Sequence, residues 1–289
     1  LPWRADPGGL ILFAIFVATT LLSLEQVQRV NLDIVPLAGG LLALGLFALV
    51  LLVRHENRAP SPLIPLGLLR QPPIWHSDAL AACHGAALVS LITFFPVYLQ
   101  VVRGESPSET GLLLVPLTIG IGTGSLVTGR LVNKTGLLTI YPIVGLAMVT
   151  AIFVALAFWV SALGTPALAG MLLFNGLFMG TVMGVVQVSV QIAAGPARLG
   201  EAAASVQFSR SIGAAFGTAL VATVLFGFLT LRNPEAARVF ASMVKHAGIG
   251  PTLPAAQRID IQADIREAFR AAFLTMAVFS TGGFFLALT

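Results

Sequence analysis

Long apolar segments separated by short polar breaks make up most of this chain. Each segment is close to the roughly 20 residues that a helix needs to cross a bilayer. The bilayer interior offers no partners to free backbone groups, so a spanning segment must be a helix or a barrel strand. A barrel strand alternates in polarity over about ten residues, whereas these segments are longer and apolar all round. The pattern therefore predicts eight transmembrane helices, at 8–24, 34–53, 76–102, 108–130, 138–160, 166–192, 203–231 and 266–289.

The breaks contain helix-start and helix-stop signals. Ser106-Pro107-Ser108-Glu109 has the spacing of a capping box with proline at the first helical position, which predicts a helix start. Gly164-Thr165-Pro166 divides the uncharged stretch between Lys134 and Arg198 into two spans.

One polar, proline-rich stretch divides the chain. It follows the second apolar segment and begins at residue 54. We therefore expect a two-helix part at 1–58, a cytoplasmic linker at 59–73 and a six-helix bundle at 74–289. The bundle carries an outer loop at 232–265. No segment has the length and polarity of a soluble domain.

The outer loop has its own helical pattern. Asn233-Pro234-Glu235 reads as an N-cap, a first helical residue and an acid near the helix N-terminus. An apolar stripe follows, which comprises Val239, Phe240, Met243 and Val244. A second stripe, which comprises Ile261, Ile265, Phe269 and Phe273, continues into the last span. We expect a short amphipathic helix on the outer membrane face and an interfacial lead-in to the last span; a flexible connecting loop is the alternative.

Composition excludes most other classes of protein. Only 10% of residues are charged and the mean hydropathy is +0.94, whereas soluble domains carry about 25% charged residues. A soluble enzyme, a disordered chain and a disulfide-stapled domain are disfavoured. The net charge of +4 comes from scattered residues, which favours membrane-flanking anchors over nucleic-acid binding. The chain starts at Leu1 and lacks a signal-peptide pattern, and we expect it to be a piece of a longer protein.

The distribution of basic residues predicts the orientation. With eight spans, the side that holds both ends carries Arg4, Arg54, Arg58, Arg70, Arg130, Lys134 and Arg198. The opposite short loops carry Arg29 and Arg103. The positive-inside rule places both ends in the cytoplasm. The long outer loop weakens this difference, because it adds Arg232, Arg238, Lys245 and Arg258.

Polar residues inside spans usually face a bundle interior or an aqueous cavity. We single out Arg210, Gln187, Gln191, Asn175 and His84 as cavity or gate residues. Arg210 either takes part in transport or reaches back to the headgroups, where it could pair with Glu201. His84 either carries a proton or bonds a neighbouring helix. Asp78 lies off the face of His84, so no metal site is expected.

Small residues recur at helical spacing. Gly176, Gly180 and Gly184 continue into Gln187 and Gln191 as one stripe of the sixth span. Gly213 and Gly217 form a similar repeat in the seventh span. Such repeats let helix backbones approach closely. They indicate either static packing or faces that slide during a transport cycle.

Catalytic signatures are missing from the sequence. We find no paired intramembrane carboxylates, no nucleophile–base set, no HExxH and no P-loop. The chain is therefore expected to be neither an enzyme nor a cofactor-binding protein.

Several motifs resemble the major facilitator superfamily, and more narrowly its fourteen-span drug:proton antiporters of the EmrB/QacA type. Segments 94–104 (FFPVYLQVVRG) and 106–116 (SPSETGLLLVP), the loop 62–70 (PLIPLGLLR) and segment 210–217 (RSIGAAFG) carry the likeness. Gly129-Arg130-Leu131-Val132-Asn133-Lys134-Thr135-Gly136 resembles the cytoplasmic loop motif Gly-x-Leu-x-Asp-Arg-x-Gly. It departs from that motif at Asn133, which replaces Asp, and at Lys134, which replaces Arg.

The resemblance implies a function and partners. The chain would be the two central helices and the C-terminal bundle of a proton-coupled multidrug exporter in the bacterial inner membrane. Such exporters alternate the access of a midplane site. Its partners would be the lipid bilayer, an amphipathic small molecule, protons and a missing N-terminal six-helix half that holds most proton carriers; a periplasmic adaptor stays open. An exporter of another small-molecule class and a non-transporting scaffold subunit are the alternatives.

Overall fold

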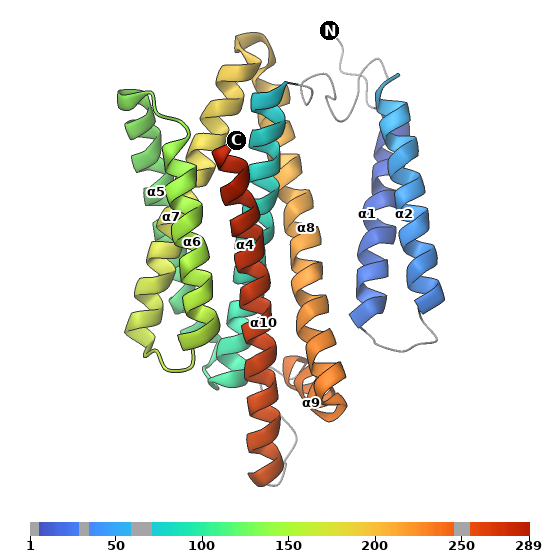
Figure 1. Ribbon diagram of the computed structural model, residues 1–289, viewed down its shortest axis with the longest axis vertical. Coiled ribbons are helices and arrows are strands. Elements are labelled where there is room, and N and C mark those ends of the chain that lie inside the picture. Colours follow the sequence, from blue (N-terminus) through green and yellow to red (C-terminus); the bar gives the residue numbers. More distant parts are fainter. Residues whose placement is uncertain (1–5, 29–34, 59–70, 246–254) are drawn as a thin grey trace.

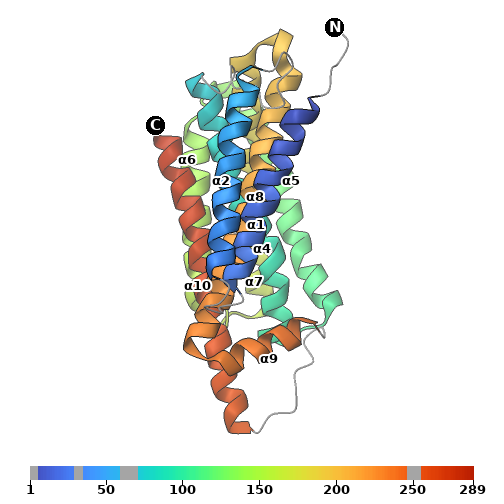
Figure 2. The same ribbon diagram turned by 90° about the vertical axis from the view of Figure 1, so that its right-hand side faces the viewer.

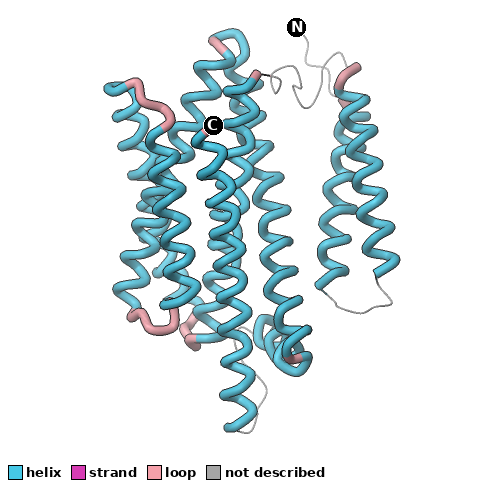
Figure 3. Tube along the Cα trace, in the orientation of Figure 1, coloured by secondary structure: helices cyan, strands magenta, loops and turns pink. Residues whose placement is uncertain are grey.

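The structure is a computed structural model that describes residues 6–28, 35–58, 71–245 and 255–289 (Figure 1). Its long helices are α1 (Pro7–Gln28), α2 (Val35–Glu56), α4 (Pro72–Val102), α5 (Pro107–Thr135), α6 (Ile140–Trp159), α7 (Thr165–Ala194), α8 (Leu199–Arg232) and α10 (Ala255–Leu288). The short α9 (Pro234–Lys245) and the 3-10 helix η2 (Pro196–Arg198) complete the set. No strand occurs in these ranges, and only short loops join the helices (Figure 3).

The predicted segments are helical where the structure describes them, and most ends lie within a few residues of the predicted ones. The exception is α10, which begins at Ala255 rather than at residue 266. Six of the helices are long and apolar enough to cross a bilayer: α4 to α8 and α10. The other two, α1 and α2, have 22 residues each. The all-helical membrane architecture is therefore confirmed, while the count of eight crossings stays a prediction. Most of the predicted linker at 59–73, the whole of segment 62–70 and the anchors Arg4, Arg29 and Arg70 lie outside the described residues.

Local signals place the helix ends. The Ser106 hydroxyl accepts a hydrogen bond from the Glu109 amide, and the Glu109 carboxylate accepts one from the Ser106 amide. The predicted capping box is therefore confirmed at the start of α5. The break at 160–164 separates α6 from α7, as predicted.

Successive long helices run in alternating directions (Figure 1). The C-terminal ends of α2 and α5 and the start of α8 consequently lie at one end of the molecule. That end carries Arg54, Arg58, Arg130, Lys134 and Arg198. The arrangement gathers these predicted cytoplasmic anchors on one side; that the side is cytoplasmic stays a prediction.

Glycines bring α5 and α7 into backbone contact. A methyl group added at Gly176 would collide with the Leu117 carbonyl, and one at Gly180 with the Ile121 carbonyl. In the other direction, Gly124 faces the Leu177 carbonyl. Gly184 is looser, since a methyl group there would lie 3.2 Å from the Ser125 carbonyl. This face of α7 is therefore a packing surface, because side chains would push the two helices apart.

A second close contact joins α4 and α8. Gly213 of α8 faces the backbone of Ala82, and Gly217 faces Ala86. From the other side, Gly85 of α4 faces the Arg210 carbonyl. The two helices run parallel, so the contact extends over several turns (Figure 1).

Helices α1 and α2 form a hairpin beside α8 (Figures 1 and 2). Asp6 caps α1, because its carboxylate accepts a hydrogen bond from the Gly9 amide. His55 Nε2 of α2 lies 2.9 Å from the same carboxylate. The Gly9 amide and, second, His55 hold the pKa of the Asp6 carboxyl below its usual value. These contacts tie the start of α1 to the end of α2.

The outer loop differs from its prediction. Asn233 caps α9 as expected, since its side-chain oxygen accepts hydrogen bonds from the Glu235 and Ala236 amides. Val239 and Phe240 of the apolar stripe of α9, however, are buried against protein, whereas Val244 is exposed. The Phe240 ring is 1% exposed and lies 5.3 Å from Phe226 of α8 and 5.7 Å from Phe269 of α10, between ring centroids. Burial against these rings replaces the lipid contact that the stripe alone suggested.

We expect Phe240→Ala to destabilise the protein by about 3–5 kcal/mol, because it empties a filled aromatic site. Val244→Ala on the same helix is the matched control; Val244 is 44% exposed, and its truncation should change stability by less than about 0.5 kcal/mol. Thermal unfolding of both variants in detergent measures the difference. Equal unfolding temperatures would contradict the packed position of α9.

Candidate transport site

Polar side chains from α4 and α8 contact α7 along one row of its residues, which comprises Asn175, Met179 and Met183. The His84 Nε2 of α4 lies 3.1 Å from the Met179 carbonyl of α7, a distance at which the ring N–H donates to the carbonyl. One turn further along α7, the Met183 sulfur lies 3.7 Å from Nη1 of Arg210, which belongs to α8. Met179 and Met183 are four residues apart and share a face. The sequence-predicted His84 and Arg210 are thereby brought together.

Asn175 precedes Met179 by one turn on the same row. Its side chain is fully buried, and neither its amide nitrogen nor its carbonyl oxygen has a hydrogen-bond partner. His84 Nδ1 is also buried without a partner. Unpaired buried polar atoms are costly, so this row holds hydrogen-bonding capacity that the described residues leave unused.

The charge of Arg210 is uncompensated in the described part of the chain. Its only hydrogen-bond partner there is the Met183 sulfur. Pairing with Glu201, one of the interpretations of the sequence, is wrong: the Glu201 carboxylate pairs with Arg198 at 3.1 Å. Arg210 is half-buried inside a helix that is apolar enough to span a bilayer. A guanidinium in that position needs water or a ligand.

The two glutamines lie nearer the end of α7. Gln187, four residues beyond Met183, is half-buried, and Gln191, at the next turn, is exposed. The sequence suggested one stripe shared with Gly176 and Gly180. In the structure those glycines face α5, while Met179 and Met183 face α4 and α8. The glycine and methionine rows are neighbouring faces of one helix.

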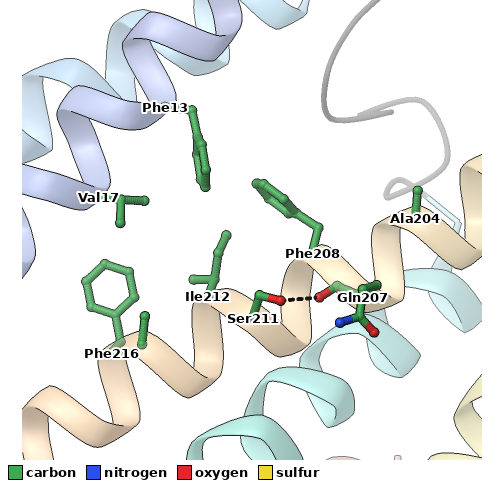
Figure 4. Close-up of a pocket in the computed structure, with 9 residues that line it drawn as sticks. Phe13, Val17, Ala204, Gln207, Phe208, Ser211, Ile212 and Phe216 are labelled. Atoms are coloured by element: carbon green, nitrogen blue, oxygen red, sulfur yellow. Dashed lines mark hydrogen bonds between the residues drawn. The ribbon is translucent and has the colours of Figure 1, made fainter.

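A cavity of about 480 Å³ lies between α1 and α8 (Figure 4). Its walls are almost wholly apolar, and the Phe13 and Phe208 rings approach to 4.7 Å between centroids at one edge. The polar exceptions are Gln207 and Ser211, whose hydroxyl donates to the Gln207 backbone carbonyl at 2.9 Å. Small-molecule sites typically measure about 300–1,000 Å³ and are mostly apolar. Sequence reasoning missed this cavity because it depends on two helices far apart in the chain.

The comparison with known families decides what this bundle is. The sequence profile described as "Major Facilitator Superfamily" matches residues 7–218. The chain belongs to the Major Facilitator Superfamily. The family match and the transporter-named relatives place this bundle among membrane transporters rather than among enzyme families.

Several relatives are named as transporters or as resistance determinants. An uncharacterised MFS-type transporter of Mycobacterium tuberculosis (strain H37Rv) is 31% identical, over 87% of this chain and 36% of its own length. The multidrug transporter protein MdtP of Bacillus subtilis is 29% identical, over 64% of this chain and 34% of its own length. A tetracycline resistance determinant of Streptomyces rimosus is 27% identical, over 76% of this chain and 64% of its own length. This chain thus spans about a third of the length of the first two.

A solved structure has the same fold. A bacterial homologue of the human lysosomal transporter Spinster, in an inward-facing and occupied conformation, superposes with a TM-score of 0.62 at 18% sequence identity. The match covers 86% of this chain and 57% of that one.

The superfamily's cytoplasmic loop motif is mostly helical here. Gly129, Arg130, Asn133 and Lys134 lie in the last turns of α5, and all but Gly129 are exposed. Gly136 ends the helix in the left-handed region, at φ 69°, and its amide donates to the Val132 carbonyl. The description of 129–136 as a loop is therefore wrong for all but its last residue. The helical pattern continues through Leu131 and Val132, and most of the motif therefore belongs to α5.

One polar pair escaped the sequence reasoning. Asp78 of α4 is buried, and its carboxylate accepts a hydrogen bond from the Ser205 hydroxyl of α8. The sequence shows an acid inside an apolar segment, which is the signal that could have found it. Its partner lies 127 positions away and carries no signal of its own.

Proposed function

We propose that this protein is a proton-coupled exporter of amphipathic or drug-like compounds that works by alternating access. One observation carries the proposal: Arg210 holds a charge inside the bundle and has no carboxylate partner among the described residues. A structural arginine would be paired, whereas one that meets a changing ligand or water is left available.

Each candidate residue then has a role. Arg210 and Gln187 contact the polar part of the compound, and Asn175 offers it the unused amide atoms. His84 holds the α4–α7 contact through the Met179 carbonyl. Gln191 lies at the exposed end of the same row, and residues 129–136 form a gate at that end.

The cavity and the relatives support the substrate class. An apolar cavity of about 480 Å³ suits a drug-sized molecule better than a sugar or an ion. The relatives are named for tetracycline resistance, multidrug transport and puromycin resistance. We propose that this protein exports compounds of the same kind.

We further propose that this chain is the C-terminal part of a fourteen-span exporter in the bacterial inner membrane. The match covers 36% of the length of a relative, which leaves room for further spans in the whole protein. The remaining partner would be a six-helix N-terminal half, which supplies the opposite wall of a midplane site that faces Arg210. The lipid of the bilayer would be the second partner.

Expression of the full-length protein in a bacterial strain stripped of its own drug exporters tests the proposal. We expect it to raise the inhibitory concentration of at least one of ethidium, tetracycline and puromycin. A protonophore should remove the accumulation difference within minutes, because the proton gradient supplies the energy. Full membrane abundance with no protection against all three would favour the scaffold alternative.

A further inference from the structure

A buried carboxyl at the α4–α8 contact has no role in the site described above. Asp78 is 4% exposed and lies in the second turn of α4. The Ser205 hydroxyl of α8 donates to Oδ2, while Oδ1 is buried without a hydrogen-bond partner. Only one of the two carboxylate oxygens of Asp78 therefore has a hydrogen-bond partner.

Apolar residues surround the pair. Leu80 and Ala81 of α4, Val186 and Val190 of α7 and Val206 of α8 belong to one buried cluster at this end of the bundle. Phe284 of α10 packs against it.

The charged groups on neighbouring helices are directed elsewhere. On α8, Arg198 and Glu201 pair with each other, and Arg210 contacts Met183. Helix α7 and the 271–288 half of α10 contain no titratable residue, and the acids and bases of α9 and of the first half of α10 lie at the opposite end. On α5, Glu109 lies at that opposite end, and Arg130 and Lys134 are exposed. On α4 itself, His76 is half-buried and His84 binds the Met179 carbonyl.

An ionised carboxylate in these surroundings is unfavourable, because burial removes its hydration and no cation among the described residues pairs with it. A neutral carboxyl fits the closed contact. If α4 and α8 separate, water can reach the carboxyl and the ionised form becomes accessible. Gly213 and Gly217 bring the α8 backbone against Ala82 and Ala86. The closed contact is therefore a tight one between backbones.

We propose that Asp78, hydrogen-bonded to Ser205, binds and releases the coupling proton as the α4–α8 contact closes and opens. This inference rests on the proposed proton-coupled export, and it places a proton carrier inside this chain rather than only upstream of it. A proton from the outer side binds the carboxylate while the contact is open. The neutral group is enclosed while the transporter changes from its outward-facing to its inward-facing conformation. The contact then reopens to the opposite side, and the proton leaves there.

Two variants separate a proton site from a structural bond. Asp78→Asn keeps the size of the side chain and an oxygen that accepts from Ser205, but it cannot titrate. Ser205→Ala keeps the carboxyl and removes its partner. Glu201→Gln is the matched control, because Glu201 is an exposed carboxylate on the same helix, four residues from Ser205.

Infrared difference spectra of the full-length protein in lipid, recorded across a pH series, detect a protonated carboxyl directly. We expect a titrating carboxyl band that Asp78→Asn removes and Glu201→Gln leaves unchanged. Ser205→Ala should move its midpoint by about one pH unit, since it removes a hydrogen bond to an ionisable group. A band that persists in Asp78→Asn overturns the inference. If that variant does not reach the membrane, an unmoved midpoint in Ser205→Ala overturns it.

Transport of ethidium into proteoliposomes is the second readout. We expect Asp78→Asn to lose accumulation driven by a pH gradient and to keep exchange of labelled for unlabelled compound. Gradient-driven accumulation at the wild-type rate in Asp78→Asn would overturn the inference. If the wild-type protein itself showed no gradient-driven transport, the proposed function would fail, while the infrared band would still report whether Asp78 titrates.

Discussion

Arg210→Ala is expected to lower export by at least about tenfold while membrane abundance stays at the wild-type level. Among the described residues the guanidinium hydrogen-bonds only to the Met183 sulfur, so its removal breaks no ion pair there. At this position α8 contacts α4 through the backbone carbonyl of Arg210, which faces Gly85. The alanine variant keeps this carbonyl. A lost hydrogen bond between a charged group and a ligand contributes about 1.5–3 kcal/mol, which corresponds to roughly tenfold to hundredfold.

The matched control is Arg198→Ala. Arg198 is also basic and lies just before α8, but it forms an exposed pair with Glu201 at 3.1 Å. Such a pair contributes about 0–1 kcal/mol, so this variant should export normally. Export rates and immunoblots of membranes, measured side by side, decide the matter. Normal export by Arg210→Ala refutes a transport role, and loss of the protein from the membrane assigns Arg210 a structural one.

The second large effect concerns the α5–α7 contact. Gly124→Ala should destabilise the protein by about 1–3 kcal/mol, because the new methyl group meets the Leu177 carbonyl, a backbone atom that cannot turn away. Gly122→Ala, two residues away on the same helix, meets nothing within 4 Å. That variant should be neutral or more stable by up to about 1 kcal/mol, since alanine favours helix more than glycine does.

Thermal unfolding in detergent compares the two alanine variants. We expect a lower midpoint for Gly124→Ala and an unchanged or higher one for Gly122→Ala. A reversed order would mean that the Gly124 face of α5 does not pack on α7. Equal midpoints would indicate a gap between the helices that absorbs a methyl group.

The fold was predictable to a large extent because bilayer physics acts on local sequence. Apolar length placed eight helices, and the hydroxyl and carboxylate spacing at Ser106 and Glu109 placed the start of α5. Glycines four residues apart, such as Gly176 and Gly180, do lie at a close helix contact. These signals need no knowledge of the partner helix.

The site was less predictable because its pairs join distant helices. Hydropathy cannot tell which face of α7 meets α5 and which meets α4, so the row of Met179 and Met183 beside the glycines was not predicted. Nothing in the sequence pairs Asp78 with Ser205 or Phe13 with Phe208. The apolar stripe of α9 was predicted to contact lipid, because the sequence does not show whether a side chain such as Phe269 or an acyl chain covers an apolar face.

The central claim is that the Met183–Gln187 side of α7 faces water and the exported compound. Cysteine accessibility tests it most directly, in a full-length Cys83→Ala background that removes the only cysteine of this chain. Met183→Cys and Gln187→Cys should react with a membrane-impermeant thiol reagent, and an exported compound should protect them. Phe174→Cys on the lipid side, where Phe174 is 57% exposed, should stay unreactive. If the cysteines at 183 and 187 are as unreactive as the one at 174, the account is contradicted.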